Sequence, residues 1–288
     1  MINEQTLNQT LLDFRQRLSG LYPKGEVDGF VRIACYNILH YESVDILLHK
    51  DSVLPDFIVD KFHKVADELL KKRPIQYIFR NAYFHGHRFE VNEATLIPRP
   101  ETEELVDMIV DENRESDLRV LDGGTGSGCI AVSLALALKF ADVTAIDLSD
   151  AALAVAARNA EALKAKVTFR RQDMLRLTPC GERYDIIVSN PPYIADSEKA
   201  DMDKNVLAYE PHMALFVPDS DPLRFYRALA VYGTWTLVPG GRLYFEINSR
   251  FPAEITRLLE GMGYTDVEIR KDMQRMPRFA VAKWNKEN

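Results

Sequence analysis

The stretch that decides the fold is Val120-Leu121-Asp122-Gly123-Gly124-Thr125-Gly126-Ser127-Gly128-Cys129-Ile130, where a short apolar run enters a glycine-rich turn and then a helix. Glycine lets the backbone turn tightly and lets a ligand approach the main chain. N–H groups at the start of a helix favour negatively charged ligand groups. Asp147 ends the next predicted strand, 23 residues after Gly124, where an acidic residue typically accepts hydrogen bonds from ribose hydroxyls. We therefore interpret the turn as a nucleotide-binding loop.

The spacing of these glycines distinguishes between two classes of nucleotide-binding enzyme. A dehydrogenase fingerprint reads G-x-G-x-x-G or G-x-G-x-x-A, whereas Gly124, Gly126 and Gly128 alternate strictly. Asp122 also precedes the loop, where it could orient the loop or the amino group of a bound methionine. This combination resembles the first motif of Rossmann-like methyltransferases that use S-adenosylmethionine. A tight turn without a ligand is the less favoured alternative.

The residues around the loop alternate between short apolar runs and helical patterns. We expect strands at 118–121, 143–146, 167–169, 186–188 and 242–247, helices at 130–138, 151–162, 222–235 and 253–262, and final strands near 265–270 and 278–284. Such alternation favours a parallel sheet with helices on both faces. The predicted fold class is α/β, with a Rossmann-like sheet.

The first 75 residues show only helical patterns. One predicted face holds Phe30, Ile33, Ala34, Asn37 and Ile38, and a second, on a helix between Pro55 and Arg73-Pro74, holds Ile58, Phe62, Val65, Ala66 and Leu69. Residues 82–92 predict a β-hairpin around Gly86, and a helix is expected to open at Glu101 or Thr102. We expect a helical domain at 1–75, a linker with the hairpin at 76–95 and a larger domain at 96–288.

Length and composition limit the class of protein. The 288 residues suggest about two domains, and 47% hydrophobic with 27% charged residues is ordinary for a globular chain. A formal net charge of −7 disfavours a protein that mainly grips nucleic-acid phosphates. Cys35, Cys129 and Cys180 match neither a disulfide framework nor a metal site. Residues 1–5 do not read as a signal peptide, and the apolar stretch 129–138 is shorter than a bilayer span. We expect a soluble cytoplasmic protein without a metal or a membrane anchor.

The second informative stretch is Asn190-Pro191-Pro192-Tyr193, which follows the predicted strand at 186–188. Active sites of α/β proteins lie at the carboxyl ends of the strands. A planar nitrogen that shares its lone pair with a π-system attacks a sulfonium methyl group poorly. Two acceptors, the side-chain oxygen of Asn190 and the carbonyl of Pro191, could hold its two N–H bonds and stabilise the charge it gains, while Tyr193 could pack against the planar group. A diproline turn that merely caps the strand would explain Pro191 and Pro192 alone.

Together these motifs resemble the HemK-type protein-glutamine methyltransferases that modify peptide-chain release factors. The resemblance covers nearly the whole chain. It rests on Arg73-Pro74-Ile75-Gln76-Tyr77-Ile78, Leu96-Ile97-Pro98-Arg99-Pro100-Glu101-Thr102-Glu103, Gly124-Thr125-Gly126-Ser127-Gly128, Asp147, Asn190-Pro191-Pro192-Tyr193, Glu210-Pro211 and Ala214-Leu215. Gly123 departs from the larger apolar residue usual in the family, which is expected to loosen the loop, and Lys271 to Arg278 departs from a glycine-containing version.

The resemblance implies a cofactor, a substrate and a set of site residues. Gly124, Thr125, Gly126, Ser127, Gly128 and Asp147 would contact S-adenosylmethionine, Gln172, Asp173 and Met174 would surround its adenine, and Asn190 would contact both cofactor and substrate. The substrate would be the glutamine of a Gly-Gly-Gln tip on a release factor, with residues 1–75 docking that protein.

Three alternatives share parts of this pattern. A DNA amino-methyltransferase would share the catalytic loop, but it must flip a base out of the duplex and needs a basic recognition region. Related enzymes methylate a glutamine of a large-subunit ribosomal protein, and only the first domain would distinguish that substrate. A protein that merely senses S-adenosylmethionine would not need the two acceptors at Asn190 and Pro191.

Overall fold

The computed structural model divides the chain into two units, Met1–Arg80 and Asn81–Asn288. It describes residues 5–179 and 181–286, so Cys180 and most of the polar N-terminus considered above lie outside the described residues. Each unit has a buried core of its own. Our domain limits at residues 75 and 96 stay predictions, and the structure groups the β-hairpin with the second unit.

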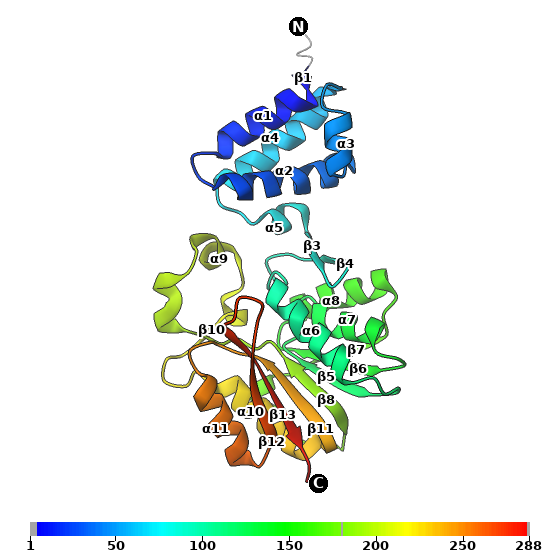
Figure 1. Cartoon of the computed structure of the whole chain (residues 1–288), viewed down its shortest axis with the longest axis vertical. Coiled ribbons are helices and arrows are strands. Elements are labelled where there is room, and N and C mark those ends of the chain that lie inside the picture. The colour runs from blue at the N-terminus through cyan, green and yellow to red at the C-terminus, as the bar shows by residue number, and fades with distance from the viewer. Residues whose placement is uncertain (1–4, 180, 287–288) are drawn as a thin grey trace. The chain divides into compact units, whose positions relative to one another are not determined.

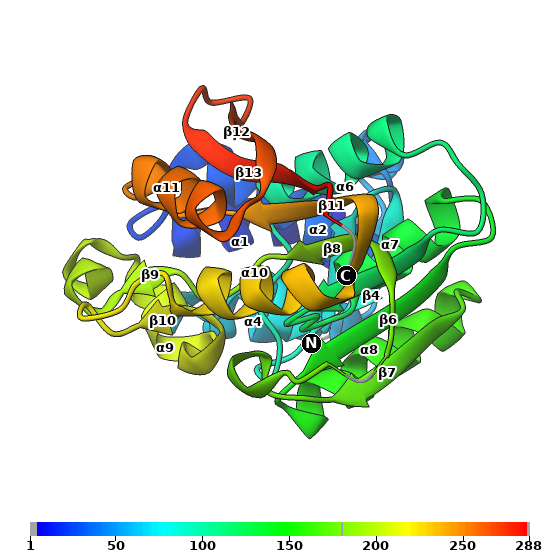
Figure 2. The ribbon, with the colours of Figure 1, turned by 90° about the horizontal axis from the view of Figure 1, so that it is seen from below.

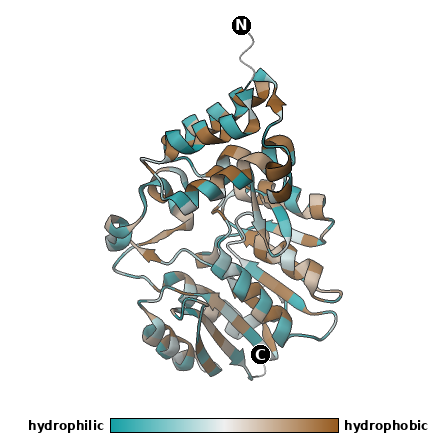
Figure 3. Ribbon diagram, turned by 45° about the horizontal axis from the view of Figure 1, so that its top comes forward, coloured by the Kyte–Doolittle hydropathy of each residue, from teal (hydrophilic) through white to brown (hydrophobic). Residues whose placement is uncertain are grey.

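The first unit is a helical bundle with one short strand pair. Its elements are β1 (Gln5–Thr6), α1 (Leu7–Leu18), α2 (Lys24–Leu39), α3 (Ser43–Leu48), β2 (Val53–Leu54), α4 (Asp56–Leu70) and α5 (Ile75–Phe79). Thr6 and Gln9 form a reciprocal capping box at the start of α1. Figure 3 shows hydrophilic and hydrophobic residues on the same helices, as expected for helices that bury one face.

The two helical faces predicted for this unit have different outcomes. On α4 all five predicted residues are buried, and the helix begins directly after Pro55. On α2 the buried residues are Val27, Val31, Ala34 and Cys35, while Ile33 is exposed. The predicted face of α2 is confirmed for Ala34, which is buried, and for Phe30 and Ile38, which pack against the same core, and it is wrong for Ile33. Apolar residues lie on both sides of the true face, so periodicity alone did not fix which stripe meets the neighbouring helices.

The second unit is built on a seven-stranded mixed sheet with the order β12-β13-β11-β8-β5-β6-β7. The strands are β5 (Arg119–Gly123), β6 (Asp142–Asp147), β7 (Val167–Arg171), β8 (Tyr184–Ser189), β11 (Leu237–Glu246), β12 (Thr265–Lys271) and β13 (Pro277–Trp284). Neighbours from β11 to β7 are parallel, but β13 is antiparallel to both β11 and β12. The expected strands are present, and the parallel arrangement predicted from the alternating strands and helices is confirmed from β11 to β7, while the last two strands add an antiparallel edge. The connection from β12 to β13 is too short for a crossover, so the strands form a hairpin.

Helices cover both faces of this sheet. They are α6 (Pro100–Glu112), α7 (Cys129–Ala137), α8 (Asp150–Leu163), α10 (Arg224–Thr236) and α11 (Pro252–Met262). Successive strand residues point to opposite faces: Ile186 and Val188 share a buried cluster with α6, α7 and α8, whereas Ile187 joins a second cluster with α10 and α11. Figures 1 and 2 show α10 and α11 side by side. The apolar stretch at 129–138 corresponds to α7, and no helix among the described residues has the length and apolarity needed to cross a membrane.

A β-hairpin begins the second unit, as predicted. Its strands are β3 (Asn81–Phe84) and β4 (His87–Glu90), and the turn residues His85 and Gly86 both have positive φ. Phe84 and Phe89 join the cluster on the α6 side of the sheet. Helix α6 then starts at Pro100, one residue before Glu101 and two before Thr102, the two expected positions, because proline fits the first turn of a helix.

The chain between β8 and α10 forms short elements that the sequence did not predict. They are β9 (Ile194–Ala195), η2 (Asp196–Asp201), α9 (Lys204–Tyr209), η3 (His212–Ala214) and β10 (Phe216–Val217). β9 and β10 pair in parallel, which brings the two ends of this excursion together. A single 3-10 turn, η1 (Met174–Arg176), follows β7.

Candidate active site

The glycine-rich turn after β5 is held by backbone hydrogen bonds to the neighbouring strand. The N–H groups of Gly124 and Thr125 both donate to the carbonyl of Ile146, at 2.8 and 3.0 Å. Gly124 and Gly126 have φ of +75° and +56°, a region that glycine adopts without strain. A Cβ on Gly126 would meet no atom within 4 Å. The main chain at Gly126 is therefore open to a ligand.

Two further glycines of this turn serve packing. A Cβ on Gly128, whose φ is +79°, would lie 3.0 Å from the Cβ of Ala156, so this position lets α7 and α8 approach closely. A Cβ on Gly123 would lie 3.2 Å from a methyl group of Leu229 and 3.3 Å from the sulfur of Met174. Those two side chains fill the space that a larger residue would take, so the structure gives no sign of the loosened loop that we expected.

Asp122 lies beneath the loop and is fully buried. Its Oδ2 accepts a 2.6 Å hydrogen bond from the hydroxyl of Thr125. Burial raises the pKa of the Asp122 carboxyl to about 7, against the lowering effect of the Thr125 bond. Of the two roles considered for Asp122, this contact supports the orientation of the loop.

The carboxylate of Asp147 joins the glycine loop to the start of α8. Its Oδ2 accepts from the N–H of Gly126 and its Oδ1 accepts from the N–H of Ser149, both at 2.9 Å. The Ser149 hydroxyl in turn caps α8 by accepting from the N–H of Ala152. A carboxylate oxygen has two lone pairs, so each oxygen of Asp147 keeps one acceptor site for a ligand hydroxyl.

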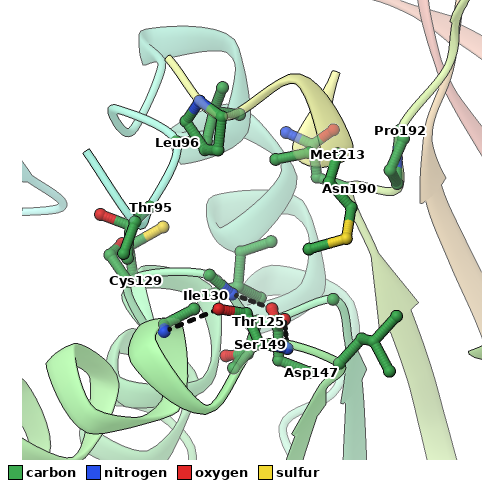
Figure 4. Close-up of a pocket in the computed structure, with 18 of the residues that line it drawn as sticks. Thr95, Leu96, Thr125, Cys129, Ile130, Asp147, Ser149, Asn190, Pro192 and Met213 are labelled. Atoms are coloured by element: carbon green, nitrogen blue, oxygen red, sulfur yellow. Dashed lines mark hydrogen bonds between the residues drawn. The ribbon is translucent and has the colours of Figure 1, made fainter. Parts of the chain in front are cut away.

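A single pocket gathers most of the predicted site residues. Figure 4 shows Thr125, Asp147 and Ser149 on one side of it and Asn190, Pro192 and Met213 on another. The predicted residues that line it are Gly124, Thr125, Gly126, Ser127, Asp147, Gln172, Asp173, Met174, Asn190 and Pro192. Those outside the lining are Asp122, Gly128, Pro191 and Tyr193. The binding or catalytic role of each residue stays a prediction.

Asn190 follows β8 and presents its side-chain amide at the pocket. The Nδ2 group donates to the hydroxyl of Thr102 at 3.1 Å. Within the described residues, the Asn190 Oδ1 atom accepts no hydrogen bond from the protein, which leaves an acceptor for a ligand. The preceding Ser189 anchors the end of β8, because its hydroxyl donates to the carbonyl of Gly123 at 2.6 Å.

Tyr193 lies among the side chains that pack beside α10 and α11, outside the pocket lining. Its hydroxyl donates to Glu246 Oε1 at 3.0 Å, and burial together with the charge of Glu246 raises its pKa far above the ordinary value. Its backbone carbonyl accepts from the side chain of Asn248 at 3.0 Å. These contacts fix the loop, and the stacking of Tyr193 on a substrate stays a prediction.

An ion pair ties the excursion after β8 to the segment before α6. Arg99 contacts the buried carboxylate of Glu210 at 2.5 Å, and the other oxygen of Glu210 accepts from the N–H of Ile97 at 3.3 Å. The next residues, Pro211, Met213 and Ala214, line the pocket. The contact therefore holds one wall of the pocket in place.

Several lining residues were not predicted as site residues from the sequence. They are Thr95, Leu96, Arg99, Thr102, Cys129, Ile130, Leu148, Ser149, Ala152, Met213 and Phe225. The segment before α6 was quoted for its resemblance to a family motif, and that was the available signal for Leu96, Arg99 and Thr102. Met213 and Phe225 carry no local signal, because Met213 is brought to the pocket by the excursion after β8 and Phe225 by the first turn of α10.

Comparison with known proteins agrees with this arrangement. Residues 101–210 match a family model described as a methyltransferase small domain. The chain is 47% identical over 277 residues to the release factor glutamine methyltransferase of Bacteroides thetaiotaomicron, which covers 96% of this chain and 99% of that protein. The chain belongs to the release factor glutamine methyltransferase family. The protein of the same name from Flavobacterium psychrophilum is 43% identical over 264 residues, covering 90% and 93% of the two chains.

A solved structure supports the fold independently. A methyltransferase from Pyrococcus furiosus superposes with a TM-score of 0.53 at 17% identity, over 76% of this chain and 98% of that chain. Its likeness bears on the fold alone. Together with the family model, it identifies the sheet as that of a Rossmann-like class I methyltransferase, as the glycine loop predicted.

Proposed function

We propose that this protein transfers a methyl group from S-adenosylmethionine to the side-chain amide nitrogen of a glutamine in a peptide-chain release factor. Two relatives that align with nearly the whole chain are named release factor glutamine methyltransferase. The observation that carries the proposal is the Asn190 amide, whose nitrogen is held by Thr102 and whose oxygen remains available in the same pocket as the glycine loop.

The pocket fits the proposed cofactor at its polar end. Asp147 retains acceptor sites for two ribose hydroxyls, and the main chain at Gly126 is unobstructed. Asp173 and Met174 line the pocket near the same loop and would flank the adenine. S-adenosylmethionine supplies a methyl group made electrophilic by its sulfonium. The residues of this chain therefore need only to bind and orient.

Asn190 and the carbonyl of Pro191 would act on the incoming glutamine. An amide nitrogen shares its lone pair with the carbonyl. It would gain positive charge as its bond to the methyl carbon forms and the bond from that carbon to sulfur breaks, with S-adenosylhomocysteine as the leaving group, and it would then lose one proton to water. Two acceptors on its N–H bonds stabilise that charge in the transition state. They also hold the nitrogen in line with the methyl group, which is a proximity effect.

The same acceptors would select the substrate. A side chain without two N–H bonds would leave Asn190 and Pro191 buried and unpaired, which carries an energetic penalty. A glutamate acceptor should therefore fail. We propose the glutamine of the Gly-Gly-Gln tip as the residue modified, because an exposed loop tip can enter a pocket.

Residues 1–75 are proposed to dock the protein substrate. None of the side chains of α3 is fully buried: Ile46 packs against the core of the first unit, whereas Val44, Leu47 and Leu48 are largely exposed. Exposed apolar side chains grouped on a surface commonly mark an interaction site. None of the lining residues of the pocket belongs to this part of the chain.

The experiment that tests the proposal incubates the protein with labelled S-adenosylmethionine and a purified release factor. We expect one methyl group on the wild-type factor and none on a factor whose Gly-Gly-Gln glutamine is changed to glutamate. Labelling of both factors, or of neither, would contradict the proposed substrate.

A further inference from the structure

A buried carboxylate anchors both ends of the Asn190–Tyr193 loop. Glu246, the last residue of β11, is 2% exposed and lies in the strand next to β8. Its Oε2 accepts from the hydroxyl of Thr102 at 2.6 Å, and its Oε1 accepts from the hydroxyl of Tyr193 at 3.0 Å. Thr102 then accepts from Asn190 Nδ2 at 3.1 Å. The four side chains form one continuous chain of hydrogen bonds.

The direction of this chain follows from the atoms available. A threonine hydroxyl has one proton, and Thr102 gives it to Glu246. The hydroxyl can then offer only a lone pair to Asn190, so the NH₂ group of Asn190 must face Thr102. The Oδ1 atom of Asn190 is left facing the pocket. The opposite direction would turn the NH₂ group toward the substrate and present a donor where an acceptor is required.

We propose that Thr102 and Glu246 are positioning residues that fix the Asn190 amide with its oxygen toward the substrate nitrogen. This inference rests on the proposed function, since it assigns the direction of one of the two acceptors. Neither residue needs to touch the reacting atoms, because each acts through Asn190. Both carboxylate oxygens of Glu246 accept a hydroxyl proton, which is the arrangement of its ionised form. Burial raises the pKa of Glu246 above its ordinary value, and the hydrogen bonds from Thr102 and Tyr193 oppose that rise.

If this inference is right, removing the hydroxyl of Thr102 should disturb the Asn190 amide, whereas removing its methyl group should not. Thr102→Val removes the hydroxyl at almost constant shape, whereas Thr102→Ser keeps it. Thr236→Val is the matched control: Thr236 is also buried, its hydroxyl donates to the carbonyl of Tyr232 at 2.9 Å, and it lies outside the pocket lining. Thr102→Ala offers a second hydroxyl deletion if the valine variant does not fold.

The first measurement needs no turnover. In the full-length protein labelled with ¹⁵N-asparagine, the side-chain NH₂ signals of Asn190 are identified by their loss in Asn190→Ala. We expect their exchange with water to be about tenfold faster in Thr102→Val, a loss of roughly one hydrogen bond, and unchanged in Thr102→Ser and Thr236→Val. Unchanged exchange in Thr102→Val, or in Thr102→Ala, would overturn the proposed contact.

The second measurement is the single-turnover rate of release-factor methylation at saturating cofactor. We expect Thr102→Val to lower the rate about 10- to 100-fold, less than the roughly 10²–10³-fold expected for removing an acceptor outright. Combined with Asn190→Ala, it should add less than about twofold, because the two residues act as one unit. If Thr102→Val lowered the rate by the same factor in the wild-type protein and in Asn190→Ala, the positioning role would be overturned. An inactive wild-type protein would refute the proposed function, and the NH₂ signals would still decide the inference.

Discussion

The clearest test of the cofactor site is the removal of the Asp147 carboxylate. Both of its oxygens accept backbone N–H groups, from Gly126 and Ser149, and both retain lone pairs that would face the two ribose hydroxyls. Asp147→Ala removes both acceptors and the link between the glycine loop and α8. Asp147→Asn keeps one oxygen and replaces the other by a donor.

The expected magnitude follows from these contacts. Each hydrogen bond to a charged acceptor contributes about 1.5–3 kcal/mol, which is roughly 10- to 150-fold in affinity. Asp147→Asn should therefore weaken S-adenosylmethionine binding by about tenfold, since one acceptor survives. Asp147→Ala should weaken it by about a hundredfold or more, because both bonds are lost and the loop is no longer anchored.

Calorimetric titration of the folded variants with S-adenosylmethionine measures these changes. Asp150→Ala is the matched control, because Asp150 is an exposed carboxylate at the start of the same helix, paired with Arg171 at 3.4 Å and outside the pocket lining. The dissociation constant of Asp150→Ala for S-adenosylmethionine should equal that of the wild type. An unchanged constant for Asp147→Ala would place the ribose elsewhere and refute the assignment.

The remaining predictions concern catalysis, pH and docking. Asn190→Ala should retain cofactor affinity and lose roughly 10²–10³-fold in single-turnover rate, and a loss below tenfold would remove it from catalysis. The folded pKa of Asp122, about 7, lies above its unfolded value, so its stabilising effect is present at low pH and is lost as pH rises through 7. The free energy of unfolding of the wild type should therefore fall by about 3 kcal/mol more than that of Asp122→Asn between pH 5 and 8. Urea titrations at both pH values measure this difference. An equal fall in the two proteins would show that Asp122 does not cause it. Changing both Leu47 and Leu48 to serine should raise KM for the whole release factor while leaving cofactor binding unchanged, and the exposed Leu12→Ser on α1 is the control. An unaltered KM would remove α3 from docking.

The parts of the site that the sequence predicted are those encoded locally. The turn at Gly124–Gly128, the strand end at Asp147 and the loop after β8 are each defined within a few residues, and the parallel sheet brings them to the same edge. The α/β fold follows from the same local alternation of strands and helices. Gly128 lies outside the pocket lining, and its lack of a Cβ lets α7 pack closely against α8.

The contacts that sequence reasoning missed join distant residues. Thr102 and Glu246 are 144 positions apart, and Arg99 and Glu210 are 111 apart. Periodicity and spacing along the chain do not indicate such pairs. The first depends on the packing of α6 beside β11, and the second on the return of the chain after α9 to the segment before α6. For the same reason Tyr193 could be recognised as part of a motif, while its bond to Glu246 could not be inferred.

One measurement tests the central claim most directly. Labelled S-adenosylmethionine is offered to the full-length protein with a release factor, a large-subunit ribosomal protein and duplex DNA as competing acceptors, and the labelled product is mapped to a single residue. We expect the label on the side-chain nitrogen of the Gly-Gly-Gln glutamine of the release factor. Label on the ribosomal protein or on DNA, with the release factor unmodified, would contradict the assigned substrate.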